Sequence, residues 1–221
     1  SAALETGLPQ LRDPEYGYRL VRVREQQRLH PNRPLVLVMG TSRTANGFSP
    51  AAAGVSEPDS PLWFNFGLSG GGPLHMRSRL GALHADGVNP DAVAVELFLA
   101  ALAVDDPPDR QCEPTAPRLT AAEVRRLEPQ LADPRALHRA WLKARLNPWQ
   151  VQQRVIMSHV SPVFLPWNRR LDHYWRNADR FGFDAYPMNE TDEQRPRRLA
   201  ERRTTYEVLA RHARVGSHAD A

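Results

Sequence analysis

Two short segments carry the side chains best suited to chemistry, and each directly follows an apolar run. The first segment, residues 40–48, reads GTSRTANGF and brings Ser42 to the end of the run Leu35–Met39. A serine at such a place can act as a nucleophile, because the backbone N–H groups of the turn can stabilise an oxyanion. Ser42 or its neighbour Thr41 can equally cap a helix that starts here. The residues alone leave both interpretations open.

The second segment, residues 64–73, reads FNFGLSGGGP and holds four glycines in six residues. Glycines at this density indicate that the backbone approaches a neighbour closely or adopts positive φ. Residues 67–71 also match the G-x-S-x-G nucleophile elbow, which makes Ser69 a weaker alternative nucleophile. The elbow normally follows several strands, so we rank Ser69 below Ser42. Neither segment is a Walker A loop or a dinucleotide fingerprint, and we predict no cofactor.

Three apolar runs predict the strands that position these segments: Leu35–Met39, Leu62–Phe66 and Ala92–Leu99. Helical patterns are predicted over Asp13–Leu29, with Asp13 as the N-cap, and over Pro73–Ala85. This alternation is typical of a parallel α/β sheet. Because the carboxyl ends of parallel strands share one edge, we expect the two segments to lie side by side there.

The alternation stops after about residue 104. We therefore expect an α/β core in residues 1–104 and a mainly helical, arginine-rich elaboration in residues 105–221 that opens with a Pro-rich loop. Helices are predicted in this second part over Thr120–Leu131, Pro134–Leu146, Pro148–Val160 and Arg195–Val215. A second apolar cluster is predicted from tryptophans and neighbouring apolar residues, namely Trp141, Trp149, Trp167 and Trp175 with Leu142, Val151, Val155 and Phe164.

Composition excludes several function classes. The chain of 221 residues has 41% hydrophobic residues but no apolar run near the roughly 18 residues that cross a bilayer, so no transmembrane segment is predicted. One cysteine, Cys112, excludes an internal disulfide, and the eight histidines show no metal-binding spacing, so we predict no metal site.

Charge is unevenly distributed along the chain. Residues 1–109 hold nine arginines against twelve acidic residues, and residues 110–221 hold twenty basic residues against thirteen acidic ones. The basic residues alternate with acidic ones on helical patterns, so no nucleic-acid partner is predicted. A polyanion-binding module built on the second half is kept as a third class of function.

Three blocks in order resemble the SGNH (GDSL-like) hydrolase superfamily, and its extracytoplasmic Gly-x-Ser-Arg branch in particular. They are GTSR from residue 40, NFGLSG from residue 65 and PDAVAVEL from residue 90, which together cover under a third of the chain. The resemblance implies a flavodoxin-like parallel sheet and a serine-dependent ester hydrolase or O-acyltransferase, whose substrate is an acyl-ester small molecule or a surface polysaccharide. It implies that Ser42 is the nucleophile and that the backbone N–H groups of Ser42 and Gly67 form the oxyanion hole.

The sequence departs from that family at two places. Ala100 stands near the position of the family's oxyanion-hole asparagine, and no Asp is followed by His three residues later, so the Asp-x-x-His block is missing. Two explanations follow. The chain is an N-terminal part of a longer hydrolase, or it is a catalytically inactive SGNH-like binding or scaffold protein of the cell envelope. The resemblance to the extracytoplasmic branch implies an extracytoplasmic protein, and because residue 1 is serine and not methionine, we expect that an upstream signal or anchor has been removed.

Overall fold

The computed structural model describes residues 9–55, 59–69, 72–97, 113–161, 163 and 178–184. Contacts divide the chain into two units, Ser1–Tyr186 and Pro187–Ala221, and every described residue belongs to the first. The predicted helix over Arg195–Val215 and the residues Trp167, Trp175, Phe164 and Ala100 lie outside the described residues.

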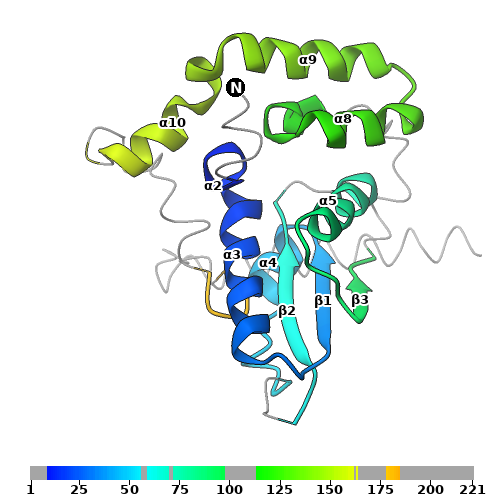
Figure 1. Cartoon of the computed structure of the whole chain (residues 1–221), viewed down its shortest axis with the longest axis vertical. Helices are drawn as coiled ribbons and strands as arrows, with labels where there is room; N and C mark the ends of the chain where they lie inside the picture. Colours follow the sequence, from blue (N-terminus) through cyan, green and yellow to red (C-terminus); the bar gives the residue numbers. More distant parts are fainter. Residues whose placement is uncertain are drawn as a thin grey trace, which may run out of the picture. The chain divides into compact units, whose positions relative to one another are not determined.

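Three parallel strands form one sheet: β1 (Leu35–Gly40), β2 (Leu62–Gly67) and β3 (Ala92–Val95). Their spatial order is β2–β1–β3, so β1 lies in the middle (Figure 1). The predicted α/β character is therefore confirmed. The third strand is shorter than predicted, because it pairs with β1 only as far as Met39 and Val95. Glu96 thus lies at the carboxyl end of β3, where the prediction had continued the strand to Leu99.

Helix α3 (Pro14–Leu29) precedes β1 and covers one face of the sheet (Figure 1). It begins as predicted, because the Asp13 side chain accepts a hydrogen bond from the Tyr16 N–H at 3.3 Å and Pro14 occupies the first turn. Tyr16 packs edge-on against Phe66 of β2, with ring centroids 5.7 Å apart. The core on this face is built from alternate strand residues and from α3 and the region around α5 (Pro73–Ala85), namely Leu35, Leu37, Met39, Phe64, Phe66, Tyr16, Leu20, Val23, Met76 and Leu83.

Helix α4 (Ser42–Gly47) contacts β1 and β2 after the first strand. Residues 178–184 contact both β2 and α4. The Asn65 N–H of β2 donates to the Phe181 carbonyl at 2.8 Å, and the Asp184 N–H donates to the Ala45 carbonyl of α4 at 3.0 Å. Gly182 has φ of 82° and lies so close to Phe64 and the Asn65 carbonyl that a Cβ would clash. This turn therefore requires glycine.

The second part of the described chain is helical. It comprises the 3₁₀ helix η1 (Glu113–Arg118), α8 (Ala121–Leu127), the 3₁₀ helix η2 (Glu128–Gln130), α9 (Pro134–Leu146) and α10 (Pro148–Val160). Helices lie where Thr120–Leu131, Pro134–Leu146 and Pro148–Val160 were predicted, whereas residues 113–118, at the end of the predicted Pro-rich loop, form a 3₁₀ helix. Helix α8 lies beside α5 (Figure 1). Helix α8 begins with a capping box formed by Thr120 and Glu123. A second apolar cluster packs around η1, α8 and α9, and it contains Leu119, Val124, Leu127 and Leu137, with Trp141 against it.

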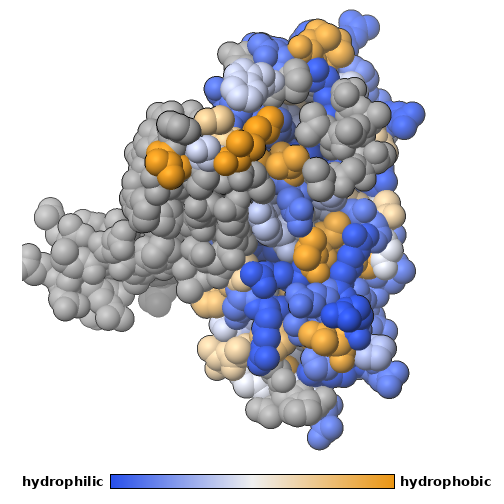
Figure 2. Space-filling model, turned by 60° about the vertical axis from the view of Figure 1, so that its left-hand side comes forward, coloured by the Kyte–Doolittle hydropathy of each residue, from blue (hydrophilic) through white to orange (hydrophobic). Residues whose placement is uncertain are grey.

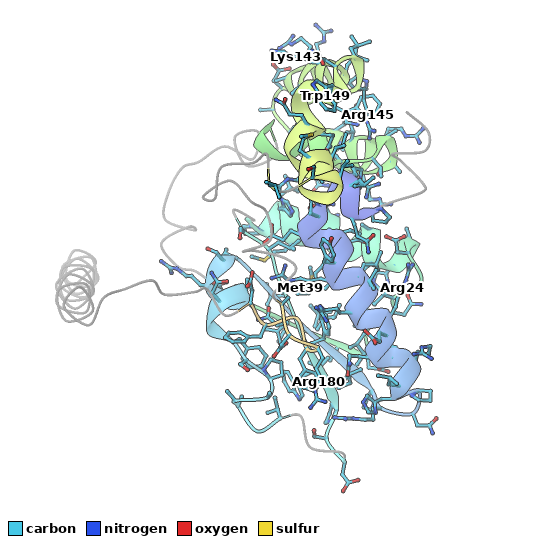
Figure 3. All side chains as sticks on the ribbon, turned by 90° about the vertical axis from the view of Figure 1, so that its left-hand side faces the viewer. Arg24, Met39, Lys143, Arg145, Trp149 and Arg180 are labelled. Carbon is cyan, nitrogen blue, oxygen red and sulfur yellow. The ribbon has the colours of Figure 1, made fainter. Side chains whose placement is uncertain are left out.

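The predicted tryptophan cluster is wrong in part. Trp141 is half-buried and donates from Nε1 to the Leu119 carbonyl at 3.0 Å. Trp149, however, is 56% exposed and Leu142 is 47% exposed. Figure 3 shows Trp149 near Lys143 and Arg145, where α9 is followed by α10. The helix boundaries were predictable from proline and capping residues, but the direction of each tryptophan depends on contacts between helices.

On the face shown in Figure 2, hydrophilic side chains dominate the described surface and hydrophobic ones form separate patches. Within the described ranges, none of the helices combines the length and the apolar character needed to cross a membrane.

Candidate functional site

The segment after β1 places Thr41 and Ser42 in different roles. Thr41 is the N-cap of α4, and its Oγ1 accepts a hydrogen bond from the Arg43 N–H at 3.2 Å. Ser42 is the first helical residue, half-buried, and its Oγ has no hydrogen-bond partner among the described residues. Of the two interpretations that the sequence left open, the capping role thus belongs to Thr41. The Ser42 hydroxyl is not used to start the helix.

Glu96 holds this segment from the end of β3. Its carboxylate accepts hydrogen bonds from the Thr41 N–H at 2.8 Å, from Thr41 Oγ1 at 3.1 Å and from Thr44 Oγ1 at 2.7 Å. The Glu96 N–H in turn donates to the Met39 carbonyl at 2.8 Å. Glu96 therefore fixes both hydroxyls that flank Ser42. Strand β2 lies on one side of β1 and β3 lies on the other, so the order of the strands reverses at β1. Glu96 and its partners therefore lie at the topological switch point of the sheet.

Gly40 is required by the same cluster. A Cβ at Gly40 would clash with the Thr44 hydroxyl and with the Glu96 carboxylate. The glycine that ends β1 therefore allows the carboxylate to approach the backbone of the Ser42 segment.

The hydrogen bonds to Glu96 stabilise its charged form. Partial burial alone would raise the pKa of Glu96, but the hydrogen bonds from Thr44 and Thr41 and the nearby charge of Arg43 lower it below its usual range. Because the folded pKa is below the unfolded one, this group stabilises the protein above the ordinary glutamate pKa. The contribution is lost as the pH falls through the lowered folded pKa.

Replacing Glu96 by alanine is expected to destabilise the protein by about 1–2 kcal/mol, because three donors lose a charged but partly solvated acceptor. Glu96→Gln keeps one carbonyl acceptor and should cost less. Urea unfolding at pH 7 and at pH 3.5 measures both variants. The difference between wild type and Glu96→Gln should shrink at the lower pH, and an unchanged difference would contradict the stated role of the carboxylate.

The segment after β2 lies next to the Ser42 segment. Gly40 pairs with Gly67 across the sheet, and the Leu68 N–H donates to the Gly40 carbonyl at 2.9 Å. The Gly67 N–H donates to Asn65 Oδ1 at 2.9 Å. An oxyanion bound by this N–H would therefore have to replace the Asn65 oxygen.

Asn65 is completely buried and ties β2 to α4. Its Nδ2 donates to the carbonyls of Thr44 at 2.7 Å and Phe48 at 2.6 Å, near the end of α4. Asn65 was not predicted from the sequence to have a role. The sequence did hold one signal for it, because Asn65 is the polar side chain inside the otherwise apolar run Leu62–Phe66.

Ser69, the alternative nucleophile, is exposed on the loop after β2. Its backbone N–H donates to Glu15 Oε1 at 2.7 Å. Burial raises the pKa of Glu15, although Arg19 opposes that rise. Asp184 lies in the same environment, where burial raises its pKa to about 6, Arg19 lowers it and Glu15 raises it. Neither carboxyl was singled out from the sequence.

None of the histidine side chains that the structure describes is hydrogen-bonded to Ser42. His84 contacts Asn89 and His138 contacts Glu128. His75 is buried against Arg79, and burial with that nearby charge lowers the pKa of His75 to about 3. These three rings therefore do not supply a base to Ser42. His173, His212 and His218 lie outside the described residues.

Within the described part of the chain, no group of three or more His, Cys, Asp or Glu side chains is placed to hold a metal ion. Comparison of the chain with protein-family models, curated proteins and solved structures finds no match.

Proposed function

We propose that this protein is a serine-dependent hydrolase or O-acyltransferase of acyl esters, with Ser42 as the nucleophile on an SGNH-like sheet. One observation carries the proposal. Of the three hydroxyls between residues 41 and 44, Thr41 and Thr44 are held by Glu96, and Ser42 alone has no partner among the described residues. The order β2–β1–β3 also agrees with the start of a flavodoxin-like sheet, whose ligands bind at the switch point.

In the proposed reaction, Ser42 Oγ bonds to the acyl carbon while its proton passes to a base. The backbone N–H of Ser42 stabilises the oxyanion, and the N–H of Gly67 joins it if the bond to Asn65 opens. The alcohol leaves with a proton and the acyl group stays on Ser42. Attack by water then gives hydrolysis, and attack by another hydroxyl gives transfer. The substrate class that follows is an acyl ester of a small molecule or of a surface polysaccharide in an extracytoplasmic compartment.

The base is the missing component of this proposal. Without a triad base, a serine site retains only what binding and the oxyanion hole supply, roughly 10³–10⁴-fold over the uncatalysed reaction. We therefore expect this chain to cleave p-nitrophenyl acetate very slowly. The slow turnover should disappear in Ser42→Ala and persist in Ser69→Ala, which is the matched control on the neighbouring loop.

Two outcomes of this assay would contradict the assignment. Equal turnover by wild type and Ser42→Ala would remove Ser42 as the nucleophile. Turnover that survives Ser42→Ala but is lost in Ser69→Ala would favour the nucleophile elbow. Brisk turnover that depends on Ser42 would instead overturn the expected absence of a base, and His173 and His212 would be the first residues to replace.

A second candidate function is a catalytically inactive binding or scaffold protein of the cell envelope. It is favoured by the hydrogen bond that satisfies the Gly67 N–H internally. Complete absence of Ser42-dependent acylation, in a protein that unfolds cooperatively, would support this alternative.

A further inference from the structure

A cleft of about 420 Å³ lies away from the Ser42 site, and its lining includes no residue of the segments after β1, β2 or β3. It is formed by α2 (Pro9–Arg12), the end of α5 and the first turns of α8. Its volume is within the range of small-molecule sites. The cleft is therefore large enough for a ligand with one ring or a short chain.

The charged side chains around this cleft leave an excess of positive charge. Its two acidic residues are already engaged. Asp86 accepts a hydrogen bond from the Tyr16 hydroxyl at 2.6 Å, and Glu123 pairs with Arg79 at 2.8 Å and accepts from Thr120. Arg125 and Arg126, by contrast, are exposed, and no carboxylate among the described residues lies within ion-pair distance of either guanidinium.

The rest of the lining consists of Pro9, Thr120 and four alanines, Ala82, Ala85, Ala121 and Ala122, so most of it is apolar and small. The N–H group of Glu123 in the first turn of α8 already donates to Thr120 in the capping box. The arginines are therefore the groups that would bind an anion in the cleft. A guanidinium binds the paired oxygens of a phosphate or carboxylate through two parallel hydrogen bonds.

We propose that this cleft binds a small organic anion, with Arg125 and Arg126 on its phosphate or carboxylate oxygens and the alanines against its apolar part. The site is independent of Ser42 and does not depend on the proposed esterase activity. A phosphate ligand and a carboxylate ligand share the chemistry that this cleft would recognise, namely an anionic group with two available oxygens beside a small apolar group.

Calorimetric titration of the full chain with phenyl phosphate and with benzoate tests the proposal and distinguishes the two anions, with phenol as the uncharged control. We expect at least one anion to bind, and phenol to bind at least about tenfold more weakly. Arg125→Ala with Arg126→Ala should weaken anion binding by about tenfold or more, because a hydrogen bond to a charged group contributes that much.

Two further variants keep the test decisive. Arg135→Ala with Lys143→Ala removes the same charge from exposed positions of α9 outside the cleft, and binding should change less than twofold. Ala122→Glu places a negative charge in the cleft at an exposed residue and should abolish binding. Failure of both anions to bind the wild type would overturn the proposal. An equal loss in the control pair would also overturn it, because binding would then follow net charge alone.

Discussion

Replacing Arg79 by methionine is expected to destabilise the protein by about 3–5 kcal/mol, the usual effect of breaking a buried ion pair. The Arg79 side chain is fully buried and pairs with Asp13 at 2.6 Å and with Glu123 at 2.8 Å. It also donates to His75 Nε2 at 3.1 Å. Without the guanidinium, two buried carboxylates lose their cation. Urea unfolding at pH 7 measures the loss.

The control for Arg79→Met neutralises both partners in the same chain. Asp13→Asn and Glu123→Gln keep side chains that can cap α3 and α8 but remove the two buried charges. The triple variant should therefore recover much of the lost stability. Two results would contradict this account. In one, the free energy of unfolding of Arg79→Met is within about 1 kcal/mol of the wild-type value. In the other, the triple variant is no more stable than Arg79→Met alone.

The same network predicts a pH dependence. Burial alone would raise the pKa of Asp13, but Arg79 and the other nearby cations lower it below its usual range. Its folded pKa is then below the unfolded one, so its contribution is present at neutral pH. The contribution is lost as the pH falls below about 4 and through the folded value. The difference in stability between wild type and Arg79→Met should therefore shrink in acid.

Asn65→Leu is expected to cost about 2–4 kcal/mol, because it leaves the Gly67 N–H and carbonyls at the end of α4 without their partner in a buried place. The Gly67 N–H should also lose protection from hydrogen exchange. Asn46→Leu, on the exposed side of the same short helix, is the matched control and should change stability by less than about 0.5 kcal/mol. Equal effects of the two substitutions would show that Asn65 does not hold α4 to β2.

Local signals were sufficient for most elements of the fold. Asp13 and Pro14 mark the start of α3, and the run Leu35–Met39 marks β1, because capping, proline geometry and continuous apolarity act within a few residues. The end of β3 was not predictable in this way. The apolar run continues to Leu99, whereas pairing stops where β1 turns into the Ser42 segment.

Ser42 and Gly67 were predicted from the sequence as candidate site residues, and their role stays a prediction, whereas the residues that hold the Ser42 segment in place were missed. Glu96 and its partners Thr41 and Thr44 are 52–55 residues apart in the sequence, so no local pattern connects them. The choice between Thr41 and Ser42 as the helix cap was likewise open, because both residues can accept the first-turn hydrogen bond. Only the extended backbone of Thr41 decides it.

The most direct test of the central claim is to locate the adduct of a fluorophosphonate on the folded chain by peptide mapping. Serine attack on phosphorus displaces fluoride and leaves a stable bond, so even a nucleophile without a base is recorded after long incubation. We expect one slowly formed adduct on Ser42, absent in Ser42→Ala and unchanged in Ser69→Ala. An adduct on Ser69 or on another residue, or labelling that is unaffected by Ser42→Ala, would contradict the assignment of Ser42 as the nucleophile.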